Sequence, residues 1–170
     1  MPLAAEWLTT IQLLKRRRRH GNQERSQSRP RPPGVMVSNA LYNSARRGFL
    51  DGSIDWDSDD IRVVLLSEEY VFSQLHENLD EVLVGARVAT SSALAGKTTD
   101  AGIADADDVV FPAVAGDEVV AIIIYQHTGD EFSSRLIAYI DSVALGFPLT
   151  PNGSDVRLRW SNGDSKIFRL

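Results

Sequence analysis

The chain has 170 residues, no cysteine and a net charge of −5 at neutral pH. The absence of cysteine excludes disulfide bonds and thiolate metal sites, and the length is sufficient for one domain with a sizeable core. No stretch reaches the roughly 20 apolar residues that a membrane-spanning helix needs. We therefore expect a protein that is soluble and does not contact a membrane.

The charge is distributed unevenly along the chain. Residues 1–35 carry eight Lys or Arg and two Glu, a net +6, so the remaining residues carry −11. The composition of this arm, with a basic run at 15–19 and a proline-rich tail, predicts disorder. The arm could bind nucleic acid or an acidic partner. The simpler interpretation is a flexible, solvated arm, or a segment that is not part of the natural product, since Met36 is a candidate start of translation. An acidic body is repelled by nucleic acid, so we expect such binding only through the arm.

The first predicted element of the body is a helix. Ser38 is a plausible N-cap, apolar residues follow at near-helical spacing from Ala40 to Leu50, and Gly52 provides a stop. A short helix, or a 3₁₀ turn, is also expected to cross the sheet within residues 67–85.

Residues 51–60 form an acidic, turn-rich segment. Asp55, Asp57 and Asp59 alternate as calcium ligands do. However, Asp60 and Leu66 stand where an EF-hand loop requires Gly and Glu. We therefore interpret the segment as a solvated loop with Trp56 packed over the edge of the core.

The strongest strand signal is the apolar run at 119–125, which is rich in β-branched residues. Such a run predicts a strand buried on both faces in the middle of a sheet. It is expected to pair as a hairpin with the apolar run at 134–140. Further strands are predicted at 61–66 and 87–94, and Pro112 predicts that the strand starting at Val109 lies at an edge.

The end of the body predicts a second hairpin. Residues 155–160 alternate between polar and apolar side chains, Asn162-Gly163 favours a tight turn, and residues 166–170 return. Short strands separated by turns, without a βαβ rhythm, predict a mainly β domain at 36–170. We expect one antiparallel β-sandwich or jelly-roll-like domain with a short N-terminal helix and one short crossing helix.

No combination of residues predicts catalysis, a cofactor or a metal site. His76 and His127 lack metal-ligand spacing. A triad drawn from His127, Asp130 and Ser133 or Ser134 lacks the motif around a nucleophilic serine. The paired glutamates are interpreted as surface carboxylates, and Gly96-Lys97-Thr98-Thr99 as a loop without the second glycine of a phosphate-binding motif. The glutamate pairs are Glu68 with Glu69 and Glu77 with Glu81.

Three aromatic residues are candidates for an interaction surface, namely Trp56, Tyr70 and Trp160. Their rings could stack on a sugar, although such residues more often lie in a core or an interface.

Most of the body resembles a family of small virion structural proteins that tailed bacteriophages and prophages encode. The resemblance depends on the order and spacing of six stretches along the chain. These are residues 49–56, 60–66, 104–109 and 135–141, Trp160, and residues 166–170. The turn at Gln126-His127-Thr128-Gly129 departs from the Lys-Asp-Thr-Gly of the relatives, and residues 1–35 have no counterpart there.

The resemblance implies a non-enzymatic component of a virion, assembled in the cytoplasm of the host bacterium. The partners would be phage capsid or tail proteins, and decoration of the head is favoured over a place in the tail. Self-association is the usual route to an assembly surface, and a trimer would suit capsid three-fold positions. A tail-associated glycan-binding module is the alternative, and a hydrolase is a third possibility that we do not favour.

Overall fold

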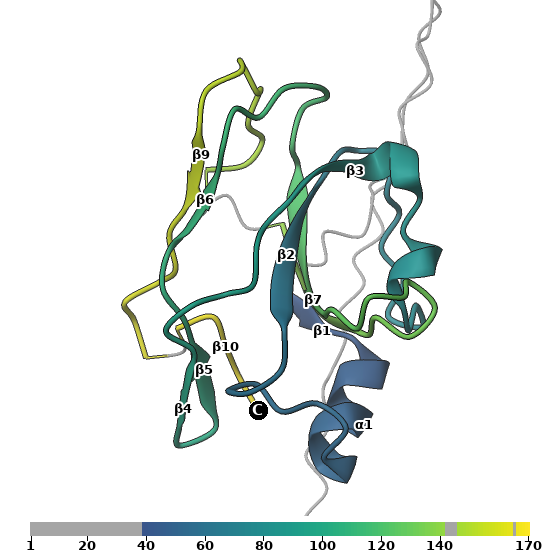
Figure 1. The fold of residues 1–170 in the computed structure, drawn as a ribbon, viewed down its shortest axis with the longest axis vertical. Helices are drawn as coiled ribbons and strands as arrows, with labels where there is room; N and C mark the ends of the chain where they lie inside the picture. The colour runs from purple at the N-terminus through teal and green to yellow at the C-terminus, as the bar shows by residue number, and fades with distance from the viewer. Residues whose placement is uncertain (1–38, 142–145, 165) are drawn as a thin grey trace, which may run out of the picture. The chain divides into compact units, whose positions relative to one another are not determined.

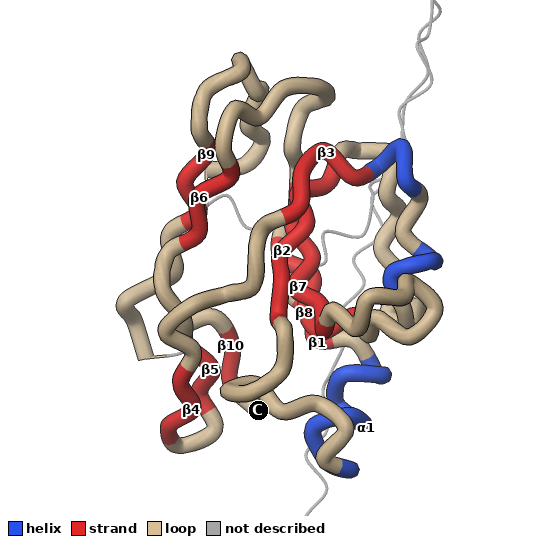
Figure 2. Tube along the Cα trace, viewed as in Figure 1, coloured by secondary structure: helices blue, strands red, loops and turns tan. Residues whose placement is uncertain are grey.

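The computed structural model describes residues 39–141, 146–164 and 166–170, which belong to one compact unit at Val35–Leu170. Within these residues the chain forms one α-helix, two 3₁₀ turns and ten short strands (Figures 1 and 2). The strands make three antiparallel sheets, so the mainly β, sandwich-like fold that we expected is confirmed. The basic arm and the Ser38 cap lie outside the described residues.

The largest sheet has five strands in the order β1-β8-β7-β2-β3. The central strand β7, Ala121–Gln126, is buried along its first five residues, as the apolar run predicts. β2, Ile61–Leu66, and β8, Leu136–Ile140, pair with it on either side. Ile123 lies between Val64 and Tyr139 in this register, and the predicted hairpin between β7 and β8 is confirmed.

The edges of this sheet are made by short strands. β1 is Ala40–Leu41, and β3, Arg87–Thr90, is shorter than the predicted strand. The chain nevertheless continues beside β2, because the Ser91 amide donates to the Val63 carbonyl at 2.8 Å and the Leu94 amide to the Ile61 carbonyl at 2.7 Å. The Ser91 hydroxyl in turn accepts the Val63 amide, which ends the regular ladder.

The remaining strands form two small sheets. β4, Thr98–Asp100, and β5, Ile103–Asp105, form a hairpin where we expected only a loop, and β10, Phe168–Arg169, pairs with β5. β6, Val109–Phe111, pairs with β9, Val156–Leu158. β6 has one neighbour and ends immediately before Pro112, as predicted for an edge strand.

The predicted terminal hairpin is wrong, because β9 and β10 belong to different sheets. The segment after β9 is held by the segment before β6. The Trp160 amide donates to the Asp108 carboxylate at 3.2 Å, and the Trp160 indole donates to the Asp107 carbonyl at 3.0 Å. Beyond the Asn162-Gly163 turn, the Ile167 amide donates to the Ala104 carbonyl at 3.1 Å. These tertiary bonds carry the chain from one sheet to another.

The helix α1, Asn43–Asp51, starts later than predicted, with Tyr42 as its N-cap. Ala40 and Leu41 form β1 instead, because they complete the sheet beside Tyr139 and Ala138. Gly52 ends the helix at a φ of 72°, the left-handed conformation that glycine adopts without strain.

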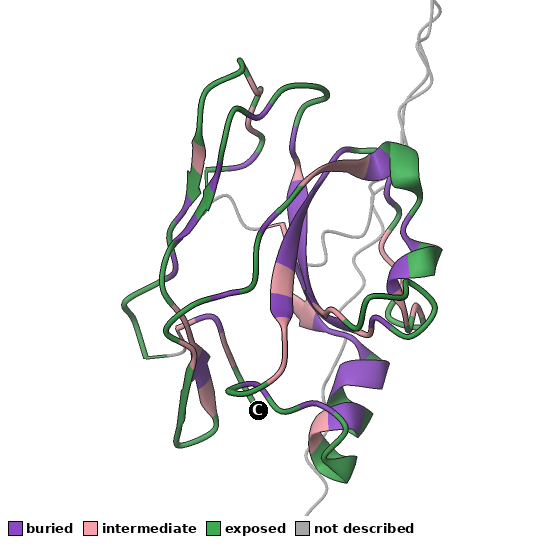
Figure 3. Ribbon diagram, viewed as in Figure 1, coloured by how far each residue is buried: buried purple, intermediate pink, exposed green. Residues whose placement is uncertain are grey.

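Of the two alternatives expected for residues 67–85, a short helix or a 3₁₀ turn, the structure has the second, as two 3₁₀ turns. They are η1, Leu79–Glu81, and η2, Val84–Ala86. η1 carries a capping box, in which the Asn78 side chain and the Glu81 side chain each accept a backbone amide of the other end. Figure 3 shows these turns as largely exposed beside the buried strands of the main sheet. In the described residues no helix is long and apolar enough to cross a membrane.

Candidate functional site

The three aromatic residues proposed as an interaction surface are buried. Trp56 is 3% exposed, and Tyr70 and Trp160 are each 8% exposed. The Trp56 indole donates to the Asp105 carbonyl at 3.0 Å, and its ring packs edge-on against Phe168. Their polar atoms are thus bonded within the chain. Such burial does not favour a shared stacking platform, so that role remains a prediction.

The acidic loop is stabilised by its own backbone. The Asp55 carboxylate accepts the amides of Asp57 and Ser58, and the hydrogen bonds from Ser58 are the main cause that lowers the pKa of Asp55. The Asp59 carboxylate accepts the Asp55 amide at 2.8 Å and the Gln126 side-chain amide at 2.7 Å. Within the described ranges, no group of three or more His, Asp or Glu residues is placed to hold a metal ion.

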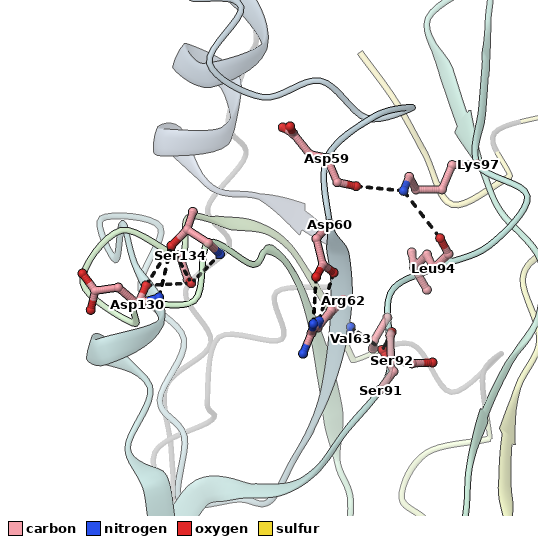
Figure 4. Close-up of polar contacts among 11 residues, drawn as sticks. Asp59, Asp60, Arg62, Val63, Ser91, Ser92, Leu94, Lys97, Asp130 and Ser134 are labelled. Carbon is pink, nitrogen blue, oxygen red and sulfur yellow. Dashed lines mark hydrogen bonds and ion pairs between the residues drawn. The ribbon is translucent and has the colours of Figure 1, made fainter.

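The lysine of the Gly96-Lys97-Thr98 sequence has a structural contact. Its Nζ donates to the Asp59 carbonyl at 2.8 Å and lies 3.5 Å from the Leu94 carbonyl (Figure 4). Lys97 therefore links the acidic loop to the segment that follows β3. A phosphate-binding role has no support in this arrangement.

Residues of the hypothetical triad lie in one turn but are not arranged as a triad. The Ser134 hydroxyl donates to the Asp130 carbonyl at 2.8 Å and accepts the Thr128 amide at 3.2 Å (Figure 4). The His127 ring instead packs edge-on against Tyr125, with ring centroids 6.2 Å apart. The serine hydroxyl thus closes a turn and faces no base.

An ion pair between Asp60 and Arg62 lies at the start of β2. Arg62 donates to both carboxylate oxygens of Asp60, at 2.9 and 2.7 Å (Figure 4). The Arg62 hydrogen bond lowers the pKa of Asp60, and the reciprocal bond raises the pKa of Arg62. The pair is partly exposed and neutralises charge at the start of the strand.

The paired glutamates also have structural partners. The Glu81 carboxylate accepts the backbone amides of Glu77 and Asn78, while Glu77 pairs with Arg47 at 3.2 Å. Neither arrangement resembles the opposed acid and base of a glycosidase.

Trp56 lines a pocket of about 280 Å³. Its walls are mainly apolar, and Asp55 and Asp57 are among its lining residues. The lining residues are Phe49, Gly52, Ile54, Asp55, Trp56, Asp57, Thr99, Gly102, Ile103, Ala104, Phe168 and Leu170. A small apolar group with polar substituents fits this chemistry.

The main candidate site is a group of exposed apolar side chains that we call the turn surface. Its members are between 64% and 77% exposed, and they lie on residues 67–86 and on the loop after β7. They are Val71, Leu75, Leu83, Val84 and Phe132. The two segments lie side by side, because the Leu79 amide donates to the Ser134 carbonyl at 2.8 Å and the Leu136 amide to the Glu77 carbonyl at 2.9 Å.

Arg87 holds these two segments together. Its side chain donates to the Val82 carbonyl at 2.9 Å and to the Leu79 carbonyl at 2.7 Å, and it pairs with Glu131 across from η2. The guanidinium is mostly buried and satisfies carbonyls at the ends of the 3₁₀ turns. Arg87 therefore fixes the backbone that presents Leu83 and Val84.

A chain of hydrogen bonds joins Tyr42, Tyr70 and His76. The Tyr42 and Tyr70 hydroxyls are 2.8 Å apart, and the Tyr70 hydroxyl is 2.9 Å from Nδ1 of His76. Burial is the main cause that raises the pKa of Tyr42, and it raises the pKa of Tyr70 and of the nearby Tyr139 to about 12 each.

The raised pKa values of these tyrosines predict that the fold is destabilised at alkaline pH. The pKa of tyrosine in an unfolded chain is about 10, so the stabilisation is complete below that pH and is lost as the pH rises through 12. For Tyr70 and Tyr139 we expect the free energy of unfolding to fall by about 1.4 kcal/mol per pH unit and per residue in this range. Circular dichroism recorded with phenolate absorbance checks this. The Tyr70→Phe variant should show a shallower decline, and full ionisation at pH 10 without unfolding would contradict the expectation.

Neither a scan against protein-family models nor a search of curated proteins finds a match for this chain. The site therefore rests on the geometry above. Arg87, Leu83, Val84 and Phe132 were not predicted as site residues from the sequence. Single apolar residues within polar turn segments were the available signal, and they are too common to be specific.

Proposed function

We propose that this chain is a non-enzymatic virion structural protein, and that it decorates a bacteriophage capsid by binding neighbouring capsid subunits. The proposal combines the resemblance of residues 38–170 to phage virion proteins with the turn surface. The observation that carries it is that five large apolar side chains are exposed on the turn surface, and that Arg87 fixes the backbone next to three of them, Leu83, Val84 and Phe132. Their burial would require a partner.

The energetics favour a binding surface. Exposed groups of large apolar side chains mark interaction sites, and burial of each such side chain contributes about 1.5–3 kcal/mol before the costs of association. The side chains project from short turns, whose conformation is already set by backbone hydrogen bonds. Little conformational entropy would be lost on binding, which suits a protein that acts by packing.

Binding to phage particles assembled without this chain tests the proposal. Val84→Ser and Phe132→Ser together should weaken binding of the purified chain about tenfold or more, because two anchoring side chains are lost. Leu50→Ser is the matched control, since Leu50 is 90% exposed on α1 and is not a member of the turn surface. Binding that is equally strong for all three proteins, or absent for the unsubstituted chain, would contradict the proposal.

The Trp56 pocket supports a second candidate function, a glycan-binding module. Carboxylates beside an aromatic wall can accept sugar hydroxyls. A glycan array with the unsubstituted chain and with Asp57→Asn distinguishes the two functions. Specific binding that Asp57→Asn abolishes, together with unchanged particle binding of the Val84 and Phe132 variant, would favour the glycan module.

A further inference from the structure

A second pocket, distinct from the turn surface, is strongly acidic. It has a volume of about 280 Å³, and four of its five lining residues carry carboxylates. The pocket lies where β2 ends and where the segment before β7 begins, and its lining residues are Ser67, Glu68, Glu69, Asp117 and Glu118. Within the described residues, Glu69, Asp117 and Glu118 form no ion pair.

Ser67 supplies an independent sign that the pocket takes a ligand. It is only 2% exposed, and its hydroxyl has no hydrogen-bond partner in the described residues. Its backbone groups are satisfied, because its amide donates to the Ala86 carbonyl and its carbonyl accepts the Tyr70 amide. A buried hydroxyl without a partner costs about 1–3 kcal/mol. A donor that enters the pocket would remove that cost and neutralise the carboxylates around it.

A pair of arginines with complementary charge lies at β9, with Arg157 in the strand and Arg159 directly after it. Arg157 and Arg159 are exposed, while Leu158 and Trp160 between and beyond them are buried, so the two arginines point to the same side. Residues two apart on a strand are separated by roughly 7 Å. Neither side chain makes an ion pair within the part of the chain that the structure describes.

The exposure of Arg157 and Arg159 leaves both side chains accessible. Within the described residues, β9 pairs only with β6, in a two-stranded sheet (Figure 1). The acidic pocket is built by other elements, at the end of β2 and before β7. The chain thus presents two surfaces of opposite charge, which is the requirement for a head-to-tail contact between identical copies.

We propose that copies of this chain associate head to tail, with Arg157 and Arg159 of one copy entering the acidic pocket of the next. Arginine suits this role, because its planar guanidinium donates to carboxylates in pairs and can also donate to the Ser67 hydroxyl oxygen. A heterologous contact of this kind closes into a ring when the rotation between copies permits it. The inference rests on the proposed function, since it describes how a decoration protein would link to its own copies.

Charge reversal tests this contact. Sedimentation velocity of the full chain at low salt should show concentration-dependent association that high salt weakens. Arg157→Glu with Arg159→Glu, or Asp117→Arg with Glu118→Arg, should each abolish association. The protein that carries all four substitutions should regain part of the association, because two of the four pocket carboxylates and both arginines have then exchanged sign while Glu68 and Glu69 remain acidic. Arg46→Glu with Arg169→Glu is the matched control and should leave association unchanged, since these exposed arginines lie on α1 and β10.

Three outcomes would overturn the inference. The unsubstituted chain could be a monomer throughout, the fourfold variant could fail to associate while it remains folded by circular dichroism, or only the pocket variant could lose association. The third result would mean that another cation occupies the pocket. None of these outcomes decides the proposed function, which is tested separately by particle binding of the Val84 and Phe132 variant.

Discussion

Replacing Ile123 by alanine is expected to lower the free energy of unfolding by about 4 kcal/mol. Ile123 is fully buried in the central strand, and Val64 and Tyr139 flank it in the neighbouring strands. A sheet held on both sides cannot easily collapse into the space that the substitution leaves. The favourable transfer free energy of the removed atoms is therefore lost, and the cavity adds a further cost. Chemical denaturation measures the change.

Two companion variants make the Ile123 prediction specific. Ile123→Val removes one methylene group and should cost about 1 kcal/mol. Val110→Ala, on the half-exposed side of the edge strand β6, should cost well under about 1 kcal/mol. Equal losses for Ile123→Ala and Val110→Ala would mean that β7 is not the centre of the core.

Replacing Arg87 by methionine is expected to cost about 3 kcal/mol. The substitution keeps the length of the apolar stem but leaves the carbonyl of Val82 without the guanidinium and breaks the pair with Glu131. Because these bonds fix the turns of residues 79–86, exchange of the Val82 and Ala86 amides, which donate to the Leu79 and Leu83 carbonyls, should accelerate as well. Chemical denaturation and hydrogen exchange measure the two effects.

Arg47→Met is the matched control for Arg87. Arg47 also pairs with a glutamate, Glu77, but both side chains are more than half exposed. Exposed pairs contribute about 0–1 kcal/mol, so we expect a loss below about 0.5 kcal/mol. Arg87→Lys should lie closer to methionine than to arginine, because an ammonium group cannot reproduce the planar pattern of donors. A loss at Arg87 no larger than at Arg47 would contradict its assigned role.

The core of the fold is predictable from the sequence because its signal is local. β2 contains the apolar run 63–66 and β7 the apolar run 121–125, and burial on both faces of a sheet requires such runs. The pairing of β7 with β8 follows from their proximity along the chain. Gly52 ends the helix for a reason of backbone geometry that the residue type carries by itself.

The separation of β9 and β10 into different sheets was not predictable, because distant partners decide it. Asn162-Gly163 favours a tight turn, but Trp160 is held by Asp107 and Asp108 more than fifty positions earlier. Ala40 and Leu41 show the same effect, since a helical pattern yields to a place at the edge of the main sheet. Local propensity is a weak prior when tertiary contacts compete with it.

The candidate site was the least predictable part. Trp56 and Trp160 were predicted from the sequence as candidates for an interaction surface because they are large aromatic residues. In the fold, however, each indole donates to a backbone carbonyl. Arg87 looks like any surface cation in the sequence, and only the folded turns show that it binds carbonyls. The acidic pocket brings Ser67 together with Glu118, a pair that no local pattern connects.

Cryo-electron microscopy of phage particles that carry this chain tests the central claim, which is that the protein acts by packing against other virion proteins. The account predicts ordered copies at fixed positions on the head, with Val84 and Phe132 buried against capsid subunits. Copies bound only at the tail, or a turn surface that faces solvent in every copy, would contradict it.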